Sequence, residues 1–413
     1  MNRPIVFVLG CTDTGKTDVA IRICRSLDGE VVNADALQLY HGLEIATNKV
    51  TREEAMGVPH HLLSFLPPTV TDFSIHNFRQ KALEAIESIH QRKKLPVVVG
   101  GTAYYVESLL YKNNLIDTSQ AAENKPSDVE EEVEGSWLEG ASNEELHRLL
   151  RQVDSASAAS LHPNNRHRVL RAIQIFYRTR RAKSQVLLER KAVDLGEKLR
   201  FNNSLLLVLD APKEILDERL DKRVDKMRVG GLRDEVEQFW IEHSSVLSSR
   251  FGVMACIGFK EFLPYLMLGE NEWRTVKGDK LFEEGIQLVQ LHTRQYSRRQ
   301  RNWISSRFMR AAYRELPAGR VLDATDGSVI AVGSESVAKW LRGEDKPELP
   351  SDPKGRKESL EKANQLFHCE ECSRPITGLD NYNKHLMGRA HRHSLRSRQR
   401  KEGKESSLEG EQR

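Results

Sequence analysis

The sequence predicts an α/β protein with a parallel-sheet core of the P-loop type, a helical insertion and a small C-terminal zinc finger. Three observations support this fold class. Short β-branched runs alternate with helical patterns over residues 1–112, which is typical of a parallel sheet with crossover helices. A polar, mostly helical stretch then precedes another buried strand. Two cysteines and two histidines with metal-ligand spacing stand near the C-terminus.

The first part of the core, residues 1–112, contains three apolar runs that we expect to be buried strands. These runs are Ile5–Leu9, Glu30–Asn33 and Pro96–Val99, and the long helical pattern before the third run covers Thr71–Arg92. Because strands alternate with helices, their carboxyl ends should meet at one edge of the sheet.

Residues 113–199 are predicted to form a helical insertion, which begins with an acidic segment and contains helices at Asn143–Gln152 and Asn165–Arg181. The core should resume over residues 200–343. We expect a strand at Leu205–Asp210, a short strand pair around Val321–Val332 and a last helix at Ser334–Leu341. A linker at 344–365, the zinc finger at 366–393 and a basic disordered tail at 394–413 complete the predicted order.

Composition limits the possible locations of the chain. Its 413 residues carry a net charge of +4, and no apolar run approaches the length of a membrane span, so we expect a soluble protein without membrane contact. The first strand follows Met1 so closely that no cleavable leader is expected. We therefore expect the cytoplasm, with a nuclear or mitochondrial pool also allowed. The few, scattered cysteines indicate a reducing compartment.

A glycine-rich loop directly follows the first strand. Gly10-Cys-Thr-Asp-Thr-Gly-Lys-Thr17 fits G-x-x-x-x-G-K-[ST], whose backbone N–H groups hold a diphosphate or triphosphate at a helix N-terminus. Lys16 should reach the outer phosphates, and the Thr17 hydroxyl should hold Mg²⁺. The predicted diphosphate-binding residues are Gly10, Thr12, Asp13, Thr14, Gly15, Lys16 and Thr17.

Polar residues follow the next two strands. Asp35 and Gln38 together could hold the polar edge of a base, although Asp35 alone is as readily explained as a helix cap. The third strand ends in Gly100-Gly101-Thr102, where glycines allow close approach of a ligand; a tight strand-to-helix turn is the plainer explanation. ATP-hydrolysing P-loop proteins usually place a carboxylate there, so its absence argues against ATP hydrolysis.

The spacing Cys369-x2-Cys372-x12-His385-x5-His391 matches a tetrahedral Zn²⁺ site. His393 is a second candidate for the last ligand, at a longer spacing. Aromatic and basic residues within the finger, among them Tyr382, Lys384 and Arg389, indicate a nucleic-acid partner.

Several segments, read in order from residue 5 to about 308, jointly resemble the tRNA dimethylallyltransferase family. They are Asp35-x-x-Gln38-x-Tyr40, Gly57-Val-Pro-His60-His61, Pro96-Val-Val-Val-Gly-Gly-Thr102-x-Tyr-Tyr105, His162-Pro-Asn164 with Arg168 and Arg171, Arg219-Leu-x-x-Arg223-Val-Asp-x-Met227-x-x-x-Gly231-Leu, Ile257-Gly-Phe-Lys-Glu261-Phe, and Thr293-Arg-Gln-Tyr296-x-x-Arg299-Gln300-x-x-Trp303. Eukaryotic members of this family carry a C-terminal C2H2 zinc finger.

The resemblance implies transfer of a dimethylallyl group from dimethylallyl diphosphate to the exocyclic amine (N6) of the adenine 3′ to the anticodon in tRNA. The phosphate loop would then hold an isoprenoid diphosphate, with Mg²⁺ and Lys16 neutralising the leaving pyrophosphate. By the same resemblance, Arg223 would clamp the pyrophosphate, Asp35 would orient or deprotonate the amine, and Thr102 would contact the nucleotide.

The resemblance also implies contacts with the tRNA anticodon stem-loop, since the target base must leave its stack. The expected tRNA-binding residues are Asp35, Ala36, Leu37, Gln38, Thr102, His167, Arg168 and Arg171. A second basic and aromatic cluster should add phosphate contacts, and it consists of Arg294, Tyr296, Arg298, Arg299, Arg301 and Trp303. We expect a monomer.

Several residues depart from the family pattern, namely Cys11, Asp13, Ala36, Asn165, Ala255 and Cys256. They leave two alternatives open. A P-loop small-molecule or nucleotide kinase would explain the loop and the segment from Leu209 to Arg223, but not the finger or the basic helices. A catalytically lapsed RNA-binding protein would explain the departures at Ala36 and Ala255.

Overall fold

The computed structural model describes residues 3–112, 115, 138, 140–192, 198–244, 252–309, 315–350, 365–372, 374–389, 391, 392 and 395. The chain forms two compact units. Unit 1 comprises Met1–Asn114 and Glu197–Asp352, and unit 2 comprises Leu115–Gly196 and Pro353–Arg413. The expected acidic segment at 116–137, most of the linker, His393 and the tail from residue 396 lie outside the described residues.

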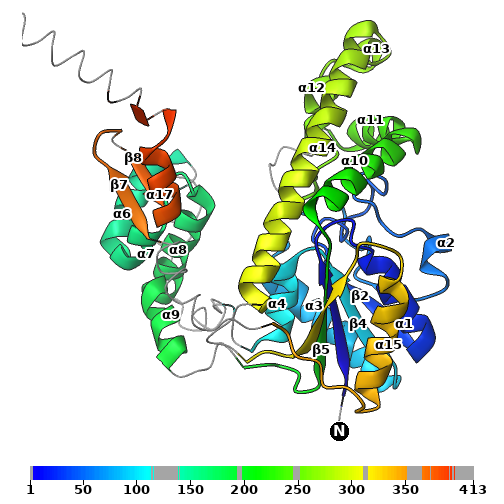
Figure 1. Ribbon diagram of the computed structural model, residues 1–413. Coiled ribbons are helices and arrows are strands. Elements are labelled where there is room, and N and C mark those ends of the chain that lie inside the picture. Colours follow the sequence, from blue (N-terminus) through cyan, green and yellow to red (C-terminus); the bar gives the residue numbers. More distant parts are fainter. Residues whose placement is uncertain are drawn as a thin grey trace, which may run out of the picture. The chain divides into compact units, whose positions relative to one another are not determined.

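Unit 1 is built on a six-stranded sheet in which every pair of neighbouring strands is parallel (Figure 1). The strand order is β3-β2-β4-β1-β5-β6. The strands are β1 (Ile5–Gly10), β2 (Gly29–Asn33), β3 (His60–His61), β4 (Leu95–Gly100), β5 (Ser204–Asp210) and β6 (Ala318–Asp323). All residues of β1, β2 and β4 are buried, as expected for a sheet covered on both faces. The predicted fold class is confirmed.

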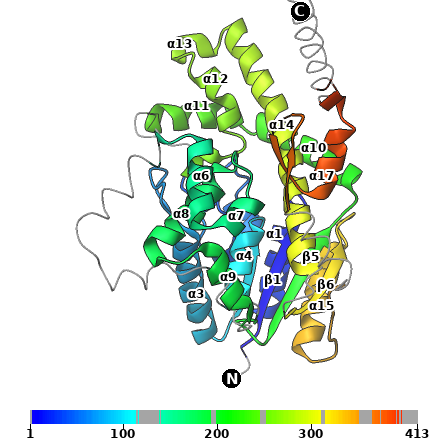
Figure 2. The same cartoon turned by 90° about the vertical axis from the view of Figure 1, so that its left-hand side faces the viewer.

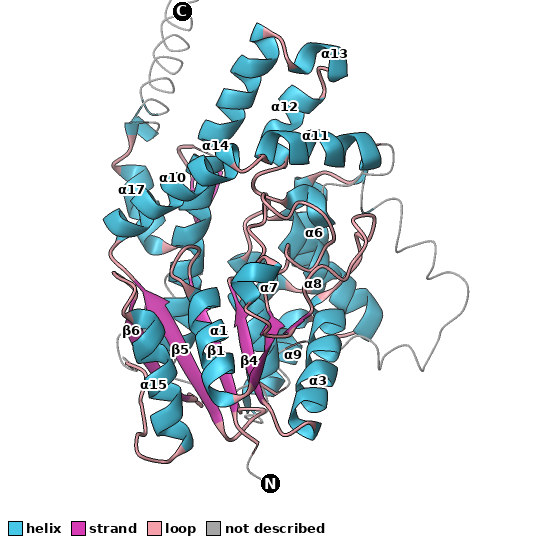
Figure 3. Ribbon diagram, turned by 90° about the vertical axis from the view of Figure 1, so that its right-hand side faces the viewer, coloured by secondary structure: helices cyan, strands magenta, loops and turns pink. Residues whose placement is uncertain are grey.

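Alternate residues of β1 enter two separate cores because successive side chains of a strand point to opposite faces. Phe7 packs with α3 (Ile75–Gln91) and α4 (Ala103–Leu110) on one face. Val8 packs with α1 (Lys16–Leu27) and α15 (Val329–Leu341) on the other (Figures 2 and 3).

A set of helices extends beyond the carboxyl edge of the sheet. It comprises α10 (Lys213–Val229), α11 (Leu232–His243), α12 (Leu263–Leu266), α13 (Glu270–Trp273) and α14 (Val276–Ile304). Helix α14 is drawn in yellow in Figure 1; it has 29 residues, packs along α10 and ends against β1 and α4. In its far half, Phe282 stacks on the Phe262 ring and meets the Tyr265 ring edge-on. The near half of α14 thus lies at the sheet edge where the strands end.

Unit 2 contains α6 (Asn143–Val153), α7 (Ser155–Ser160), α8 (Arg166–Thr179) and α9 (Lys183–Ala192), followed much later in the chain by β7 (Leu366–Cys369), β8 (Arg374–Thr377) and α17 (Leu379–Leu386). Helices α6, α7 and α8 lie side by side around Leu146, Leu150 and Ile173 (Figure 2). The His162 Nδ1 accepts from the Asn164 N–H at 3.0 Å, so its Nε2–H donates to the Pro375 carbonyl at 2.9 Å. This bond joins the finger to the insertion.

Two expectations about elements were wrong. The strand pair around Val321–Val332 is a single strand, β6, which pairs in parallel with β5, and α15 begins at Val329 instead of Ser334. Asp323 and Asp326 accept hydrogen bonds from the backbone of Thr325 and Ser328, and these turns end β6. The apolar run after Ser328 then packs as one face of a helix, because β-branched residues do not by themselves distinguish strand from helix.

Helix boundaries elsewhere follow capping residues. Helix α3 begins at Ile75 because the Ser74 side chain accepts from the Asn77 N–H and completes a capping box. In the part of the chain that the structure describes, no helix combines the length and apolarity needed to cross a membrane.

Candidate active site

The glycine-rich loop joins β1 to α1 at the carboxyl edge of the sheet. Gly15 has φ 75° and Asp13 has φ 69°, so the loop turns through two left-handed residues before the helix starts. A Cβ on Gly10 would lie 2.5 Å from the Thr14 Oγ1, which donates to the Cys11 carbonyl at 2.9 Å. The loop is therefore tightly folded, with its backbone N–H groups at the N-terminus of α1.

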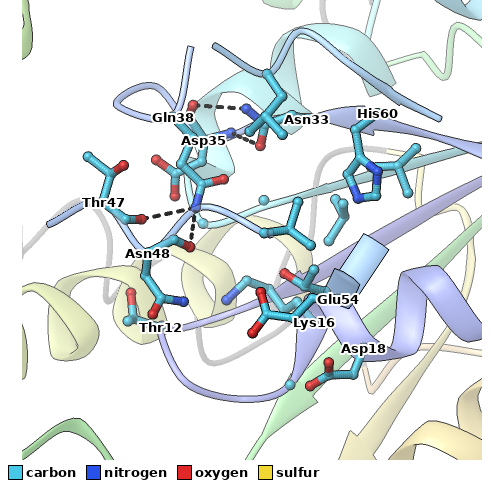
Figure 4. Close-up of a pocket in the computed structure, with 18 of the residues that line it drawn as sticks. Thr12, Lys16, Asp18, Asn33, Asp35, Gln38, Thr47, Asn48, Glu54 and His60 are labelled. Atoms are coloured by element: carbon cyan, nitrogen blue, oxygen red, sulfur yellow. Dashed lines mark hydrogen bonds between the residues drawn. The ribbon is translucent and has the colours of Figure 1, made fainter. Parts of the chain in front are cut away.

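A cavity of about 210 Å³ opens at this loop, and Lys16, Arg223 and Asp35 all line it. Figure 4 shows Lys16 and Asp35 among the residues of its wall. Its wall consists of Thr12, Asp13, Gly15, Lys16, Thr17, Asp18, Val31, Asn33, Asp35, Gln38, Thr47, Asn48, Val50, Glu54, His60, Leu63, Val99, Gly100, Gly101 and Arg223. These residues come from α1, β2, α2 (Arg52–Ala55), β3, β4, α10 and the loops between them, and all belong to unit 1.

Lys16 and Arg223 are the cationic side chains of the cavity. Burial lowers the pKa of Lys16, the Arg223 guanidinium lowers it further, and Asp35 acts in the opposite direction. Burial also lowers the pKa of Arg223, whose Nε atom is buried and lacks a hydrogen-bond partner. Among the described residues neither cation forms an ion pair within 4 Å, although the Lys16 Nζ donates to the Cys11 carbonyl at 2.7 Å. Two desolvated cations without a paired carboxylate make a site for an anion.

Asp35 lies just beyond β2, and its position is set by neighbouring backbone. Its N–H donates to the Asn33 Oδ1 at 3.2 Å, and its Oδ1 accepts from the Leu37 N–H at 3.2 Å. The next described helix begins only at Arg52, so the helix-cap explanation for Asp35 is wrong, and this carboxylate oxygen instead closes a local turn. The other, Oδ2, lies next to Gly101, where a Cβ would be only 3.2 Å away. Asp35 can therefore keep its backbone bond and still offer an oxygen to a ligand.

Thr102 and Gln38 are held by the same backbone segments. The Thr102 Oγ1 accepts from the Ala36 N–H at 3.0 Å, which ties the end of β4 to the segment after β2. The Gln38 Nε2 donates to the carbonyls of Thr47 and Asn48, each at 3.1 Å (Figure 4). The Gln38 amide nitrogen is thus occupied by the protein, which leaves its oxygen for a ligand.

Sequence reasoning missed several residues of the cavity, among them Asn33, Thr47, Asn48, Glu54 and His60. A polar residue at the carboxyl end of a buried strand is a usable signal for Asn33. His60 Nδ1 lies 2.8 Å from the Val58 carbonyl, and its Nε2 is buried without a partner. Its place in the segment Gly57-Val-Pro-His60-His61, which resembles the family, was the available signal, although no role was assigned to it.

Oxygen donors surround the start of α1. Thr17 lines the cavity, as do the carboxylates of Asp13, Asp18 and Glu54. Burial raises the pKa of Asp18, and Glu54 and Asp13 raise it further, so these carboxylates lie close enough to repel one another. Hydroxyl and carboxylate oxygens are the ligands that Mg²⁺ prefers, and this donor set fits the expected ion.

The second predicted basic cluster is largely neutralised. Arg298 pairs with Asp217 at 3.2 Å, Arg301 pairs with Asp210 at 2.8 Å, and Arg294 pairs with Asp221. These arginines hold α14 against α10 and the end of β5. Sequence alone could not show this because each partner stands more than 70 positions away.

In unit 2, the basic residues of α8 divide into two groups. The Arg166 guanidinium points inward and donates to the carbonyls of Ala141 at 2.6 Å and Leu138 at 2.9 Å. His167 and Arg168 are exposed, and Arg171 is half-buried. Burial lowers the pKa of Lys183 at the start of α9, and Arg168 lowers it further, so positive charge concentrates on this side of the insertion.

The four predicted zinc ligands converge. One ligand atom from each of Cys369, Cys372, His385 and His391 lies within 4.8 Å of the others. The His391 Nδ1 is 3.5 Å from the Cys369 Sγ and 3.3 Å from the Cys372 Sγ. Zn–S bonds of about 2.3 Å and Zn–N bonds of about 2.0 Å at tetrahedral angles require such separations, so the cluster fits a zinc finger.

Fold and site together define an α/β protein with a cationic cavity at the carboxyl edge of a parallel sheet, beside a carboxylate. A family model described as IPP transferase matches residues 38–307. The tRNA dimethylallyltransferase of Mus musculus is 36% identical over 412 residues, covering 96% of this chain and 87% of the relative. That of Schizosaccharomyces pombe is 31% identical and covers 96% of both.

A solved eukaryotic dimethylallyltransferase acting on tRNA superimposes with a TM-score of 0.77, at 28% identity, covering 98% of this chain and 100% of that one. The chain therefore belongs to the IPP transferase family of tRNA dimethylallyltransferases. The resemblance drawn from the motifs is confirmed.

Replacing Lys16 by Met should weaken binding of inorganic pyrophosphate at least tenfold, measured by calorimetry, because a buried cation is lost from the anion site. The ligand-free protein should become more stable. The folded-state pKa of Lys16 lies below its ordinary value of 10.5, so charging it costs stability. The increase in the free energy of unfolding of this variant over the wild type should be largest below the folded-state pKa of Lys16 and should vanish as the pH rises to 10.5. Lys226→Met, at an exposed site on α10, is the control.

Replacing Cys372 by Ser should release zinc and unfold the finger while unit 1 stays folded, because so short a unit depends on its metal. Zinc content and hydrogen exchange over 365–392 measure the effect, with exposed Lys384→Ser as control. Loss of protection in β1 as well would show that the finger is not a separate folding unit.

Proposed function

We propose that the chain transfers a dimethylallyl group from dimethylallyl diphosphate to N6 of the adenine 3′ to the anticodon in tRNA. Family membership supports a tRNA prenyltransferase. The observation that carries the proposal is a single cavity that places two cations, Lys16 and Arg223, beside the Asp35 carboxylate, neither of them in an ion pair with any described residue. Such a site suits a reaction in which an anionic group leaves on one side and a proton on the other.

The glycine-rich loop, Lys16 and Arg223 would bind and stabilise the leaving diphosphate. As the allylic C–O bond breaks, negative charge accumulates on the leaving diphosphate, and groups already in place stabilise it without reorganisation. Backbone N–H groups of Gly15 and Lys16, the Lys16 ammonium and the Arg223 guanidinium would surround that charge. When bound at Thr17, Mg²⁺ would supply further neutralisation of the phosphate oxygens.

Asp35 would activate the adenine amine, which is the acceptor of the dimethylallyl group, and Thr102 would contact the same nucleotide. An exocyclic adenine amine is barely basic, so its attack on carbon benefits from a carboxylate that accepts its hydrogen. The Asp35 Oδ2, at the cavity wall, would take that role while Oδ1 keeps its bond to Leu37. The C–N bond forms as the C–O bond breaks, and the amine proton passes to the carboxylate.

The base must be extruded from the anticodon loop, at a cost of a few kcal/mol that contacts with the pocket must offset. The Gln38 oxygen suits the edge of an adenine. Phosphates of the stem-loop would meet His167, Arg168 and Arg171 of α8, and the exposed Lys384 and Arg389 of the finger suit the same polyanion. Binding should therefore weaken steeply with salt.

Incubating the chain with dimethylallyl diphosphate and an anticodon stem-loop should give N6-isopentenyladenosine, detected by mass spectrometry of the nucleosides. Asp35→Asn should lower kcat on the order of 100-fold, because proton acceptance is lost, while pyrophosphate affinity changes less than threefold. Unchanged turnover in that variant would remove Asp35 from the mechanism. Magnesium-dependent ATP turnover without RNA, in place of prenylation, would favour a kinase.

Replacing Arg168 and Arg171 by Glu should weaken stem-loop binding at least tenfold. The slope of the logarithm of the binding constant against the logarithm of the salt concentration should fall by the contribution of about two phosphate contacts. Affinity for dimethylallyl diphosphate should not change, since these residues lie in unit 2 and the cavity in unit 1. Filter binding at several salt concentrations measures the effect, with Lys339→Glu on α15 as control. Equal loss of both affinities would mean that the helix is structural.

A further inference from the structure

Helix α14 presents polar residues on a face where apolar residues are expected. Thr293, Ser297 and Gln300 are buried at helical spacing on the half that meets the sheet edge. A buried helix face is normally apolar, since each polar group taken from water must find a partner. Partners are evident for two of the three. Ser297 interacts with Cys11 in the glycine-rich loop, and Gln300 forms several hydrogen bonds.

Gln300 is 4% exposed and bridges the two halves of the site. Its Oε1 accepts from the Thr12 N–H at 2.9 Å and from the Thr12 hydroxyl at 3.0 Å. Its Nε2 donates to the Gly101 carbonyl at 2.8 Å. A side-chain amide is the group that can accept on one side and donate on the other, which a carboxylate cannot do.

Gly101, which accepts the Gln300 hydrogen bond, also lies beside the Asp35 carboxylate. A Cβ on Gly101 would lie 2.4 Å from the Gln300 Nε2 and 3.2 Å from the Asp35 Oδ2, so both side chains approach the same face of this glycine, which leaves room for them because it has no Cβ. The Oγ1 of Thr102, the next residue, accepts from the Ala36 N–H. Hydrogen bonds from Thr12 to Gln300, from Gln300 to Gly101 and from Ala36 to Thr102 thus connect the glycine-rich loop, through the Gly101–Thr102 peptide, to the segment that carries Asp35.

We infer that Gln300 is a positioning residue that fixes the distance between the phosphate loop and the Asp35 wall; this inference rests on the proposed transfer reaction. Gln300 does not line the cavity and acts through Thr12 and Gly101. In the reaction, one carbon atom loses its bond to the diphosphate oxygen and gains a bond to the adenine nitrogen. The loop that would hold the diphosphate and the Asp35 carboxylate that would hold the amine must therefore stay at a fixed distance from each other. A displacement of about 1 Å can lower the rate on the order of 100-fold.

The test compares Gln300→Met, which keeps the volume and removes all three hydrogen bonds, with the wild type. We expect kcat to fall at least tenfold, while the affinity for inorganic pyrophosphate and the KM for the stem-loop change less than threefold. Gln287→Met, at an exposed site on the same helix, should stay within twofold of the wild type. Thermal midpoints establish that each variant is folded.

Two further variants test whether Gln300 positions the loop relative to Asp35 or only stabilises the loop. Gln300→Glu can still accept from Thr12 but cannot donate to the Gly101 carbonyl, so its kcat should fall as far as that of Gln300→Met. In an Asp35→Asn background, Gln300→Met should cost less than threefold more, because the group it positions no longer acts.

The inference is overturned if Gln300→Met retains kcat within twofold. It is equally overturned if the loss of kcat persists in full with Asp35→Asn and is matched by a loss of pyrophosphate affinity. If the wild-type chain transfers nothing, the proposed function fails and the role of Gln300 fails with it. A wild type that is active and indistinguishable from Gln300→Met overturns the role of Gln300 alone.

Discussion

The position of β4 between β2 and β1 is the constraint on which the site depends. Parallel pairing brings Asn33 at the end of β2 beside Val99, and Leu9 at the end of β1 beside Gly100. The phosphate loop, the Asp35 segment and the Gly100-Gly101 turn therefore emerge from adjacent strands. A Cβ on Gly100 would lie 2.2 Å from the Ala34 backbone, so this approach requires a glycine. Any register shift would separate the loop from the carboxylate.

Charge is distributed unevenly around this edge. Outside the cavity, Arg301 and Arg298 each have an aspartate partner, and the buried Glu30 is paired with Arg92. Inside the cavity, Lys16 and Arg223 have none among the described residues. Leaving desolvated cations unpaired costs stability, so binding of an anion in this cavity would stabilise the fold. Because Arg298 and Arg301 are paired with aspartates, a count of basic residues in the sequence overestimates the surface available for RNA phosphates.

The sequence was sufficient for features that depend on local pattern. The four buried strands β1, β2, β4 and β5 were predicted from their apolar runs to within one residue of the observed bounds, and the finger ligands converge as their spacing requires. What it could not supply depends on contacts between distant residues. Gln300 reaches Thr12 across 288 positions, and Arg301 reaches Asp210 across 91. The helix starting at Val329 was misread because burial against α1, unknown from sequence, decided its structure.

Unit 2 is assembled from two stretches of chain separated by much of unit 1. The polypeptide passes from unit 1 to the insertion, returns, and leaves again for the finger. The Pro375 carbonyl that His162 contacts lies 213 residues further along the chain. During synthesis, the insertion helices therefore emerge long before the finger that completes their unit. Closing so long a loop costs entropy that grows only slowly with its length. Docking of the finger, ordered by its metal, can thus act as the last step that closes the chain.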